Sequence, residues 1–592
     1  MGAIAAFLDS SGMDPADVAR RMADAVPHRG PTVRTVVLGR SALACRGGDG
    51  GDAVIGIVDG LAIALVGSLD NSAELAQALG CKAPVALNDA AMLSLLAAGY
   101  RAFGLDLPAR MRGVFAGAIS SGDRLYCFRD HIGYRPLFYR TDRRGFYAAT
   151  EAKQIVAGAG IPKEPDMDVV AQIFFRTLDD DSPAALKGVN RLPKSSGIET
   201  GDHGYRLRRY WHPETLLEAH PIPPEELKPR FDRLMDQAVA RCLTGRDAIA
   251  LSGGVDSPAV AAYAAPRHLA LGGLPLQAIS VVYPKYPTVD ESRYVVMLAD
   301  RFGIPLHTYE QTASPVADLA RWVSLTDTPF VGAALAQYEE DYRRIHALGC
   351  RMVLTGEHAE FVFAMQWNTL DHFLTHGRLR PAWREMADRR ARGRSWLSVA
   401  RFAARSIASD RLLAARAAIG RRPAAGIPEW VDRSRVGAGA MRPARDRWRL
   451  SQLRGFIGPG VSLEAEEVCQ AVTGVASRKP WTDVDLWEFF LGLPAEQKFP
   501  DLRPKGLVRD LLRGRVPDII LDREDKTVFD EAALAEIDYA ALTRVIDPSK
   551  QRVEGVDYAA LGSLLTARKL GTQDYRWARS LATVHAFLAQ WA

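Results

Sequence analysis

The chain contains the stretch Ala248-Ile-Ala-Leu-Ser252-Gly253-Gly254-Val255-Asp256-Ser257-Pro258, in which an apolar run enters a Ser-Gly-Gly turn before an Ala-rich helix pattern. Two glycines let the backbone turn tightly and bring its N–H groups close to phosphate oxygens. The following helix directs the partial positive charge of its N-terminus at the same anion. Asp256 supplies a hard oxygen ligand of the kind that Mg²⁺ takes beside a nucleotide. The complete pattern therefore predicts nucleotide binding, whereas a bare Ser-Gly-Gly would indicate an ordinary strand-to-helix turn.

This pattern resembles the PP-loop of ATP pyrophosphatases, which split ATP into AMP and pyrophosphate. A Walker-type loop would end in Gly-Lys-Ser/Thr, and no such ending occurs in the sequence. The resemblance implies adenylyl transfer with ATP and Mg²⁺ as cofactors. The residues expected to contact the nucleotide in this loop are Ser252, Gly253, Gly254, Asp256 and Ser257.

Strand and helix patterns alternate from about residue 225 onward. Strand patterns begin at Ala248, Ala278, Leu306 and Met352, with a helix pattern over 290–302. This alternation predicts an α/β region with a parallel, doubly wound sheet. Ligands bind beyond the carboxyl ends of the strands in such sheets, and Ser252 and Gly356 both fall at that edge.

Residues 1 to about 208 contain short strands broken by turns, with helix patterns over 14–25 and 89–98. The strand patterns cover 54–58, 61–66, 114–119, 125–128 and 136–139, and the N-terminus itself is predicted to be a first strand. Strands covered by helices predict an α+β layered domain.

Composition places the chain among ordinary globular proteins. Its 592 residues are enough for two or more domains, and 48% are hydrophobic and 24% charged. The six cysteines are scattered without a CxxC spacing, which argues against a disulfide framework or a zinc site and predicts a reducing cytoplasm. There is no run of eighteen apolar residues, so no membrane helix is expected. A net charge of +5 does not by itself indicate nucleic acid.

Residues 378–454 carry 20 Arg against 6 Asp plus Glu and no Lys. One interpretation is a set of surface helices. The other is a basic groove for an acidic polymer, either an acidic peptide or RNA.

Several further motifs resemble the asparagine-synthetase family over nearly the whole chain. In the first part they are Pro27-His28-Arg29-Gly30-Pro31, Gly67-Ser-Leu-Asp-Asn71, Asp130-His-Ile-Gly-Tyr-Arg-Pro-Leu-Phe-Tyr139, Glu151-Ala-Lys153 and Arg209-Tyr210-Trp211-His-Pro213. The resemblance implies a degenerate glutamine-amidotransferase-like domain of the αββα Ntn type over 1–208. It also implies an ATP-dependent synthetase domain over 209–592, with a PP-loop parallel sheet and a helical C-terminal part.

One position departs from the family pattern. The glutaminase of this family uses a cysteine at position 2, whose thiolate attacks glutamine, and this chain has Gly2. We therefore expect the first domain to keep the fold without glutaminase chemistry, so that the nitrogen does not come from glutamine.

The synthetase half keeps more of the family's residues. Thr355-Gly356-Glu357-His358-Ala359-Glu360 lies where the family has Gly-Glu-Gly-Ser-Asp-Glu. The match implies that Glu360 binds Mg²⁺ together with Asp256, and that Glu357 orients or deprotonates an amine. Glu357 is otherwise a helix-start acid favoured by the helix dipole.

The end of the chain also follows the family order, with Arg478-Lys-Pro480-Trp-Thr-Asp483, Lys505-Gly-Leu-Val-Arg509 and Arg523-Glu-Asp-Lys526-Thr-Val-Phe529. The match implies that Lys526 is catalytic and stabilises the phosphate and the developing oxyanion. It also implies that Val281 packs on adenine, with the backbone of Ala250 and Gly356 beside the base or ribose.

Family members without the nucleophilic cysteine include β-lactam synthetases, carbapenam synthetases and lasso-peptide cyclases. Three features favour a lasso cyclase, which forms a macrolactam from a precursor core peptide. They are the chain length, the sequence Leu69-Asp70-Asn71 and the Arg-rich region. The resemblance then implies a leader peptidase and a leader-binding element as partners, without membrane or nucleic acid. The alternatives are a β-lactam or carbapenam synthetase, an ammonia-dependent asparagine synthetase, and a catalytically dead peptide-binding scaffold.

Overall fold

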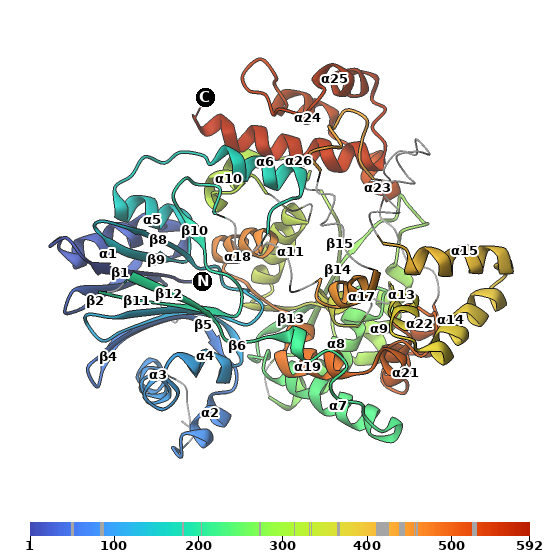
Figure 1. Cartoon of the computed structure of the whole chain (residues 1–592), viewed down its shortest axis with the longest axis horizontal. Helices are drawn as coiled ribbons and strands as arrows, with labels where there is room; N and C mark the ends of the chain where they lie inside the picture. Colours follow the sequence, from blue (N-terminus) through green and yellow to red (C-terminus); the bar gives the residue numbers. More distant parts are fainter. Residues whose placement is uncertain are drawn as a thin grey trace.

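The computed structural model describes residues 1–48, 52–82, 88–179, 183–202, 204–271, 274–312, 314–330, 332, 334–363, 368–409, 426–436, 444–454, 456, 460–523 and 530–591. Figure 1 shows two layered sheets of the N-terminal part on the left and the α/β part on the right.

Two antiparallel sheets of six strands each form the N-terminal part. One has the strand order β10-β8-β9-β1-β3-β2, and the other has the order β12-β11-β7-β6-β5-β4. Their strands are β1 (Ala3–Asp9), β2 (Thr32–Leu38), β3 (Ser41–Gly47), β4 (Ala53–Val58), β5 (Leu61–Leu69), β6 (Gly113–Ser120), β7 (Leu125–Arg129), β8 (Phe138–Asp142), β9 (Gly145–Ala149), β10 (Asn190–Arg191), β11 (Ser196–Gly201) and β12 (Gly204–Arg209). The predicted first strand and the five predicted strand patterns are present, although β8 begins two residues later than its pattern.

Helices cover the outer face of each sheet. Helices α1 (Pro15–Asp24) and α5 (Ala152–Ala159) pack on the first sheet, and α3 (Asp89–Phe103) packs on the second. A core made mainly of alanine, leucine and isoleucine side chains fills the space between the sheets. The αββα arrangement predicted for this part is therefore confirmed (Figure 1).

One helical stretch in the described part of the chain, Asp89–Arg110, is long and apolar enough by length and composition to cross a membrane. In the structure its α3 portion packs Met92, Leu93 and Leu96 against the second sheet, where these side chains are buried.

The second part is built on a parallel sheet with the strand order β15-β14-β13-β16-β17. Its strands are β13 (Asp247–Ala250), β14 (Gln277–Val282), β15 (Leu306–Glu310), β16 (Met352–Leu354) and β17 (Ala476–Arg478). The four predicted strands and the doubly wound, parallel arrangement are confirmed. The fifth strand, β17, was not predicted.

Helices pack around this sheet and continue into the C-terminal region (Figure 1). Helix α7 (Pro224–Ala240) precedes β13, and between the strands lie α8 (Asp256–Ala270), α9 (Ser292–Phe302), α10 (Leu319–Thr326), α11 (Leu335–Ala347), α12 (Ala359–Phe363), α13 (Thr369–Thr375), α14 (Leu379–Ala391), α15 (Trp396–Ile407), α17 (Ala444–Gln452) and α18 (Val461–Thr473). After β17 come α19 (Val484–Gly492), α20 (Ala495–Lys498), α21 (Gly506–Leu511), α22 (Asp518–Leu521), α23 (Asp530–Ala535), α24 (Tyr539–Val545), α25 (Tyr558–Ala567) and α26 (Thr572–Leu588). The shorter helices of the first part are α2 (Ser72–Ala78), α4 (Leu107–Arg110) and α6 (Met167–Phe175).

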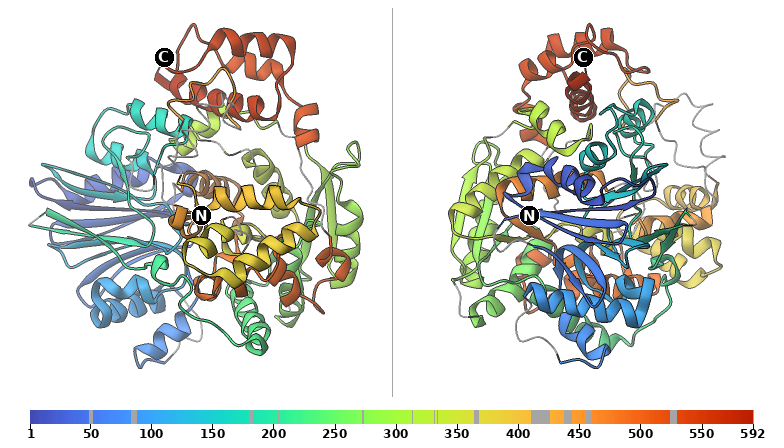
Figure 2. Two further views of the ribbon diagram at one scale, coloured as in Figure 1. Left: turned by 45° about the vertical axis from the view of Figure 1, so that its right-hand side comes forward. Right: turned by 90° about the vertical axis from the view of Figure 1, so that its left-hand side faces the viewer.

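The described part of the Arg-rich region is helical. Figure 2 shows α14 and α15 as neighbouring helices on the outside of the second part, and the two helices contact each other. Most of their arginine side chains are exposed. The choice between surface helices and a basic groove stays open.

Helix α18 joins the two parts, because its carboxylates are paired with arginines of the first part. Glu464 accepts a hydrogen bond from Arg191 at 2.9 Å, and Glu467 accepts one from Arg29 at 2.5 Å and another from Arg135. All five side chains are buried. Charges buried in this way are tolerated only when they are paired, so the first part is fixed in place against α18.

Candidate functional site

The site lies at the carboxyl edge of the parallel sheet, where the loops after β13 and β16 meet. These two strands are neighbours in the sheet although β14 and β15 come between them in sequence. The strand order therefore reverses at this point, which is where ligands bind in open parallel sheets. The predicted loop follows β13, and α8 begins directly after it at Asp256.

Gly356 lies in close contact with the start of α8. A Cβ atom at this position would be 2.3 Å from the backbone nitrogen of Ser257 and 2.6 Å from the carbonyl carbon of Asp256. Only glycine lets the loop after β16 approach the helix so closely. The structure thus brings Gly356 against the predicted phosphate loop.

Hydrogen bonds within the loop shape its turn. The backbone N–H of Ser252 donates to Ser257 Oγ at 2.9 Å, and the two serine hydroxyl oxygens lie 3.1 Å apart. The N–H of Gly254 donates to Ser252 Oγ at 3.4 Å. The serines at the two ends of the motif therefore close the loop over the first turn of α8.

A carboxylate accepts a hydrogen bond from one of the backbone amides of the loop. The N–H of Gly253 donates to Glu291 Oε2 at 2.9 Å, and Arg523 donates to Glu291 Oε1 at 2.8 Å and to the carbonyl of Gly253 at 3.1 Å. Glu291 thus takes the place of an anion on this amide, which indicates that the loop attracts negative charge. Glu291 could not be predicted from the sequence, because the motif carries no signal for a partner outside the loop.

The two carboxylates predicted to bind Mg²⁺, Asp256 and Glu360, lie close enough for the charge of one to affect the pKa of the other. Lys505 Nζ lies 2.6 Å from Asp256 Oδ1 and 2.5 Å from Oδ2. Burial, followed by the nearby charge of Asp256, raises the pKa of Glu360 above its usual value. No group of three or more His, Cys, Asp or Glu suits a metal ion within the described ranges. Two carboxylates nevertheless fit Mg²⁺, which keeps several waters and takes its remaining oxygens from phosphates.

Glu357 lies between a phenol and an ammonium. Tyr338 OH donates to Glu357 Oε1, and Lys479 Nζ lies 2.5 Å from Oε2. Burial raises the pKa of Glu357, but the adjacent Lys479 charge outweighs burial and holds this pKa below its usual value. Burial, aided by Lys479, lowers the pKa of the neighbouring His358 to about 3, so its imidazole is neutral at pH 7.

A cavity of about 960 Å³ connects the loop with Glu357. Ser252, Glu291 and Glu357 lie in its wall. Ala250 and Val281, predicted beside the base, line the same cavity at the ends of β13 and β14. Its far side is formed by α23 and α26. The volume lies near the upper end of the range for ligand pockets, about 300–1,000 Å³, so the cavity is of a size that binds a ligand as large as a nucleotide.

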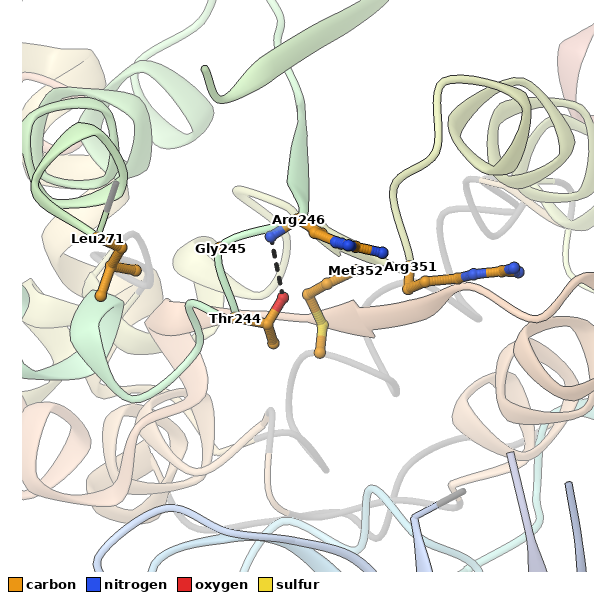
Figure 3. A pocket seen from close by; sticks show the side chains of 6 residues that line it. All are labelled: Thr244, Gly245, Arg246, Leu271, Arg351 and Met352. Carbon is orange, nitrogen blue, oxygen red and sulfur yellow. Dashed lines mark hydrogen bonds between the residues drawn. The ribbon is translucent and has the colours of Figure 1, made fainter. Parts of the chain in front are cut away.

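A second pocket, of about 440 Å³, lies at the opposite, amino edge of the sheet. Figure 3 shows Thr244, Gly245, Arg246, Leu271, Arg351 and Met352 around it. Its lining residues lie before or at the starts of β13 and β16, so the length of the sheet separates this pocket from the loops that follow the two strands.

Two further predictions concern Lys526 and position 2. Lys526 lies outside the described residues, so its predicted catalytic role stays a prediction. At Gly2, a Cβ atom would lie 2.7 Å from Ala53 Cβ and 2.9 Å from the carbonyl oxygen of Arg46. The corner beside Gly2, bounded by Ala53 and the backbone of Arg46, is therefore too full to hold a nucleophilic side chain.

An αββα part joined to a parallel-sheet part with a PP-loop turn defines a two-part architecture of the glutamine-amidotransferase and synthetase kind. The chain belongs to the asparagine synthase family, whose pattern matches residues 230–592. The glutamine amidotransferase domain pattern matches residues 1–211.

Individual relatives resemble parts of the chain. It is 24% identical over 439 residues to asparagine synthetase (glutamine-hydrolyzing) 3 of Bacillus subtilis, covering 70% of this chain and 66% of that protein. It is 30% identical over 214 residues to carboxyethyl-arginine beta-lactam-synthase of Streptomyces clavuligerus, covering 36% of this chain and 38% of that protein. A solved structure of glutamine phosphoribosylpyrophosphate amidotransferase from B. subtilis covers 60% of this chain and 81% of its own, with 12% identity and a TM-score of 0.27. The chain thus spans just under two thirds of the first relative's length.

Proposed function

We propose that this chain is an AMP-forming, ATP-dependent amide ligase that closes a macrolactam in a ribosomally made lasso peptide. Membership of the asparagine synthase family and the cavity that joins the loop to Glu357 support the ligase class. The observation that carries ring closure is the filled corner at Gly2, because a chain without glutaminase chemistry needs an amine from another source.

In the first step, the side-chain carboxylate of an Asp or Glu in the peptide attacks the α-phosphorus of ATP. A bond forms between a carboxylate oxygen and phosphorus, and pyrophosphate leaves. The amides and hydroxyls of Ser252–Ser257 bind the polyphosphate, and Ala250 and Val281 flank the base. Asp256 and Glu360 would hold Mg²⁺, which when bound offsets charge on the phosphates.

In the second step, the N-terminal amine of the same peptide attacks the activated carbonyl. The new C–N bond replaces the C–O bond to AMP, and the proton released by the amine goes to Glu357, which is ionised and lies in the cavity wall. Holding both ends of one peptide in one cavity replaces a bimolecular encounter.

The proposal includes partners and location. A peptide substrate needs a free N-terminus, so a leader peptidase and a leader-binding element would deliver the core peptide in the cytoplasm. The arginines exposed on α14 and α15 support contact with an acidic peptide segment.

A second candidate is a β-lactam synthetase acting on a small β-amino acid. The similarity to carboxyethyl-arginine beta-lactam-synthase favours it. An ammonia-dependent asparagine synthetase and a non-catalytic peptide-binding scaffold are the remaining alternatives.

ATP–pyrophosphate exchange tests these candidates. We expect exchange with synthetic peptides that carry a free N-terminus and one internal aspartate or glutamate, followed by a product that has lost one water. The N-acetylated peptide is the matched control, since it keeps the acid for exchange and cannot form the ring. Exchange with carboxyethyl-arginine alone would favour the β-lactam candidate, exchange with free aspartate alone the asparagine synthetase, and no exchange with any of them the scaffold.

A further inference from the structure

A buried ammonium lies directly behind Glu357. Lys479 Nζ is 2.5 Å from Glu357 Oε2 and also 2.5 Å from Glu466 Oε2. The side chains of Lys479 and Glu466 are 1% and 4% exposed, whereas that of Glu357 is 33% exposed. Only Glu357 of these three therefore reaches the cavity, and Lys479 touches it from the protein side.

Hydrogen bonds fix the two carboxylates on either side of Lys479. Tyr338 OH donates to Glu357, and Tyr342 OH donates to Glu466 Oε1 at 3.1 Å. Both phenols belong to α11, and their rings stack at 5.9 Å. Among the described residues, the charged and titratable side chains around the three include Tyr134, Lys194, Tyr338, Asp341, Tyr342, His358, Glu360 and Cys469.

The N-terminal part contributes to this group. Lys479 Nζ lies 5.2 Å from the ring centre of Tyr134, which is buried in the first part of the chain. The preceding residue, Arg478, donates to Ser68 Oγ at 2.8 Å and to the carboxylate of Asp70. The first part of the chain, which has glycine in place of the glutaminase cysteine, therefore fixes the position of the segment that carries Lys479.

Charge balance makes Lys479 necessary for an ionised Glu357. Burial raises the pKa of Glu466 above its usual value, and without the ammonium Glu357 and Glu466 would be like charges in a poorly solvated place. A shared site of that kind takes up a proton. A protonated Glu357 accepts no proton from an amine.

We propose, on the basis of the amide-forming function above, that Lys479 is a positioning residue for the second step: its ammonium, braced by Glu466 and by Tyr134 of the N-terminal part, keeps Glu357 ionised and directed into the cavity. Its ammonium lies against Glu357, Glu466 and the ring of Tyr134, and among the described residues it has no hydrogen bond or ion pair to the loop that would bind ATP, so it takes no part in adenylation.

Lys479→Met tests the proposal with the free-amine, internal-aspartate peptide that gives the strongest exchange. We expect exchange within about twofold of the wild type, whereas macrolactam formation falls by about 100-fold, the size expected for a lost general base. The acid limb of the product-formation profile should move to higher pH, because a base with a raised pKa is deprotonated at higher pH. Equal losses of exchange and product would indicate a merely structural role and overturn the proposal, as would no change in either.

Two further variants sharpen the test. Glu466→Gln placed in the Lys479→Met background removes the like charge, so it should restore part of the product formation and return the acid limb toward its original position. Lys498→Met is the matched control, since Lys498 is another buried lysine whose Nζ donates to Gln452 Oε1 at 2.7 Å, outside this network. It should leave both steps unchanged.

A measurement that needs no enzymatic turnover distinguishes failure of this proposal from failure of the proposed function. Infrared difference spectra of the full chain, with Glu357→Gln to identify the band, report whether Glu357 is a carboxylate or a carboxylic acid. We expect the carboxylic acid band to appear at higher pH in Lys479→Met than in the wild type, even if no peptide supports exchange. An unshifted band would overturn the role of Lys479, whatever the substrate proves to be.

Discussion

Lys505 places its ammonium against both carboxylate oxygens of Asp256, at 2.6 and 2.5 Å, at the first residue of α8. An ammonium in this position shows that the start of α8 accommodates a cation beside the phosphate loop. Lys505 comes from the loop before α21, so two segments distant in sequence meet at this carboxylate.

Asp256→Asn should abolish the adenylation step. The neutral amide keeps the shape of the side chain but gives up its charge toward Mg²⁺ and Lys505, so we expect exchange to fall by at least about 100-fold, as for loss of one preorganised electrostatic contact. Asp300→Asn, at an exposed position near the end of α9, is the control and should behave as the wild type. Unchanged exchange in Asp256→Asn would contradict the assignment of the loop.

Val281→Trp should weaken ATP binding. Val281 is half-buried and lines the cavity at the end of β14, where the larger side chain would fill the space predicted for adenine. We expect the Kd for ATP, measured by titration calorimetry, to rise by about tenfold or more, equivalent to about 1.4 kcal/mol. Val296→Trp, at a side chain that is 47% exposed on α9, should leave the Kd unchanged. An equal Kd in both variants would place the base elsewhere.

Gly356→Ala should disturb the contact between the loop after β16 and α8. The added Cβ would meet the Ser257 nitrogen at 2.3 Å, so backbone must shift, and we expect the free energy of unfolding to fall by about 1–3 kcal/mol. ATP binding should weaken in parallel, because the displaced residues form the start of α8. Gly562→Ala in α25, where nothing lies within 4 Å, is the control and should be neutral or slightly stabilising by up to about 1 kcal/mol.

Gly2→Cys should fail to produce a glutaminase. The new side chain would begin 2.7 Å from Ala53 Cβ, so we expect a loss of about 1–3 kcal/mol in the free energy of unfolding and no glutamate release from glutamine. Gly47→Ala probes the same corner, but its added Cβ would lie 3.9 Å from Ala53 Cβ, so it should be tolerated. Glutamate release by Gly2→Cys would show that the corner opens and would weaken the case for an amine supplied by the peptide.

Lys498 should make stability depend on pH above neutrality. Burial lowers its pKa from 10.5 to about 7 in the folded state. Between pH 7 and pH 10.5 the unfolded chain therefore binds more protons at this residue, so its contribution to stability rises with pH, by up to about 1.4 kcal/mol per pH unit. Lys498→Met removes this dependence, so its stabilisation relative to the wild type should be largest near pH 7 and shrink toward pH 10 in denaturant titrations. A difference that stays constant with pH would show that Lys498 keeps an ordinary pKa.

Ten of the strands could be predicted from the sequence, because their apolar runs are bounded by turn residues. Six strands of the first part, β2, β3, β9, β10, β11 and β12, were not predicted. β17 escaped prediction, since Ala476-Ser477-Arg478 has no apolar run and is a strand only because it pairs with β16. The pattern for β8 began at Pro136, whereas the ladder begins at Phe138. A proline has no N–H to donate to a ladder, which explains part of this shift.

The candidate site divides in the same way. The loop from Ser252 to Ser257 is a local motif and was identified from its own residues. Its partners were not, because Glu291 is 38 residues from Gly253 and Lys505 is 249 residues from Asp256. Lys479 was quoted within a family motif, but no sequence signal indicated that its side chain meets Glu357. Such pairings are set by tertiary packing alone.

The buried carboxylates of α18 also limit how this protein can be recombined. A chimera that took its first 208 residues from a relative without arginines at positions 29, 135 and 191 would strand Glu464 and Glu467 away from water and counter-charge. Each such loss typically costs about 3–5 kcal/mol, comparable to a large share of a domain's entire stability. Such a chimera is therefore expected to be strongly destabilised unless α18 is taken from the same relative as the first 208 residues.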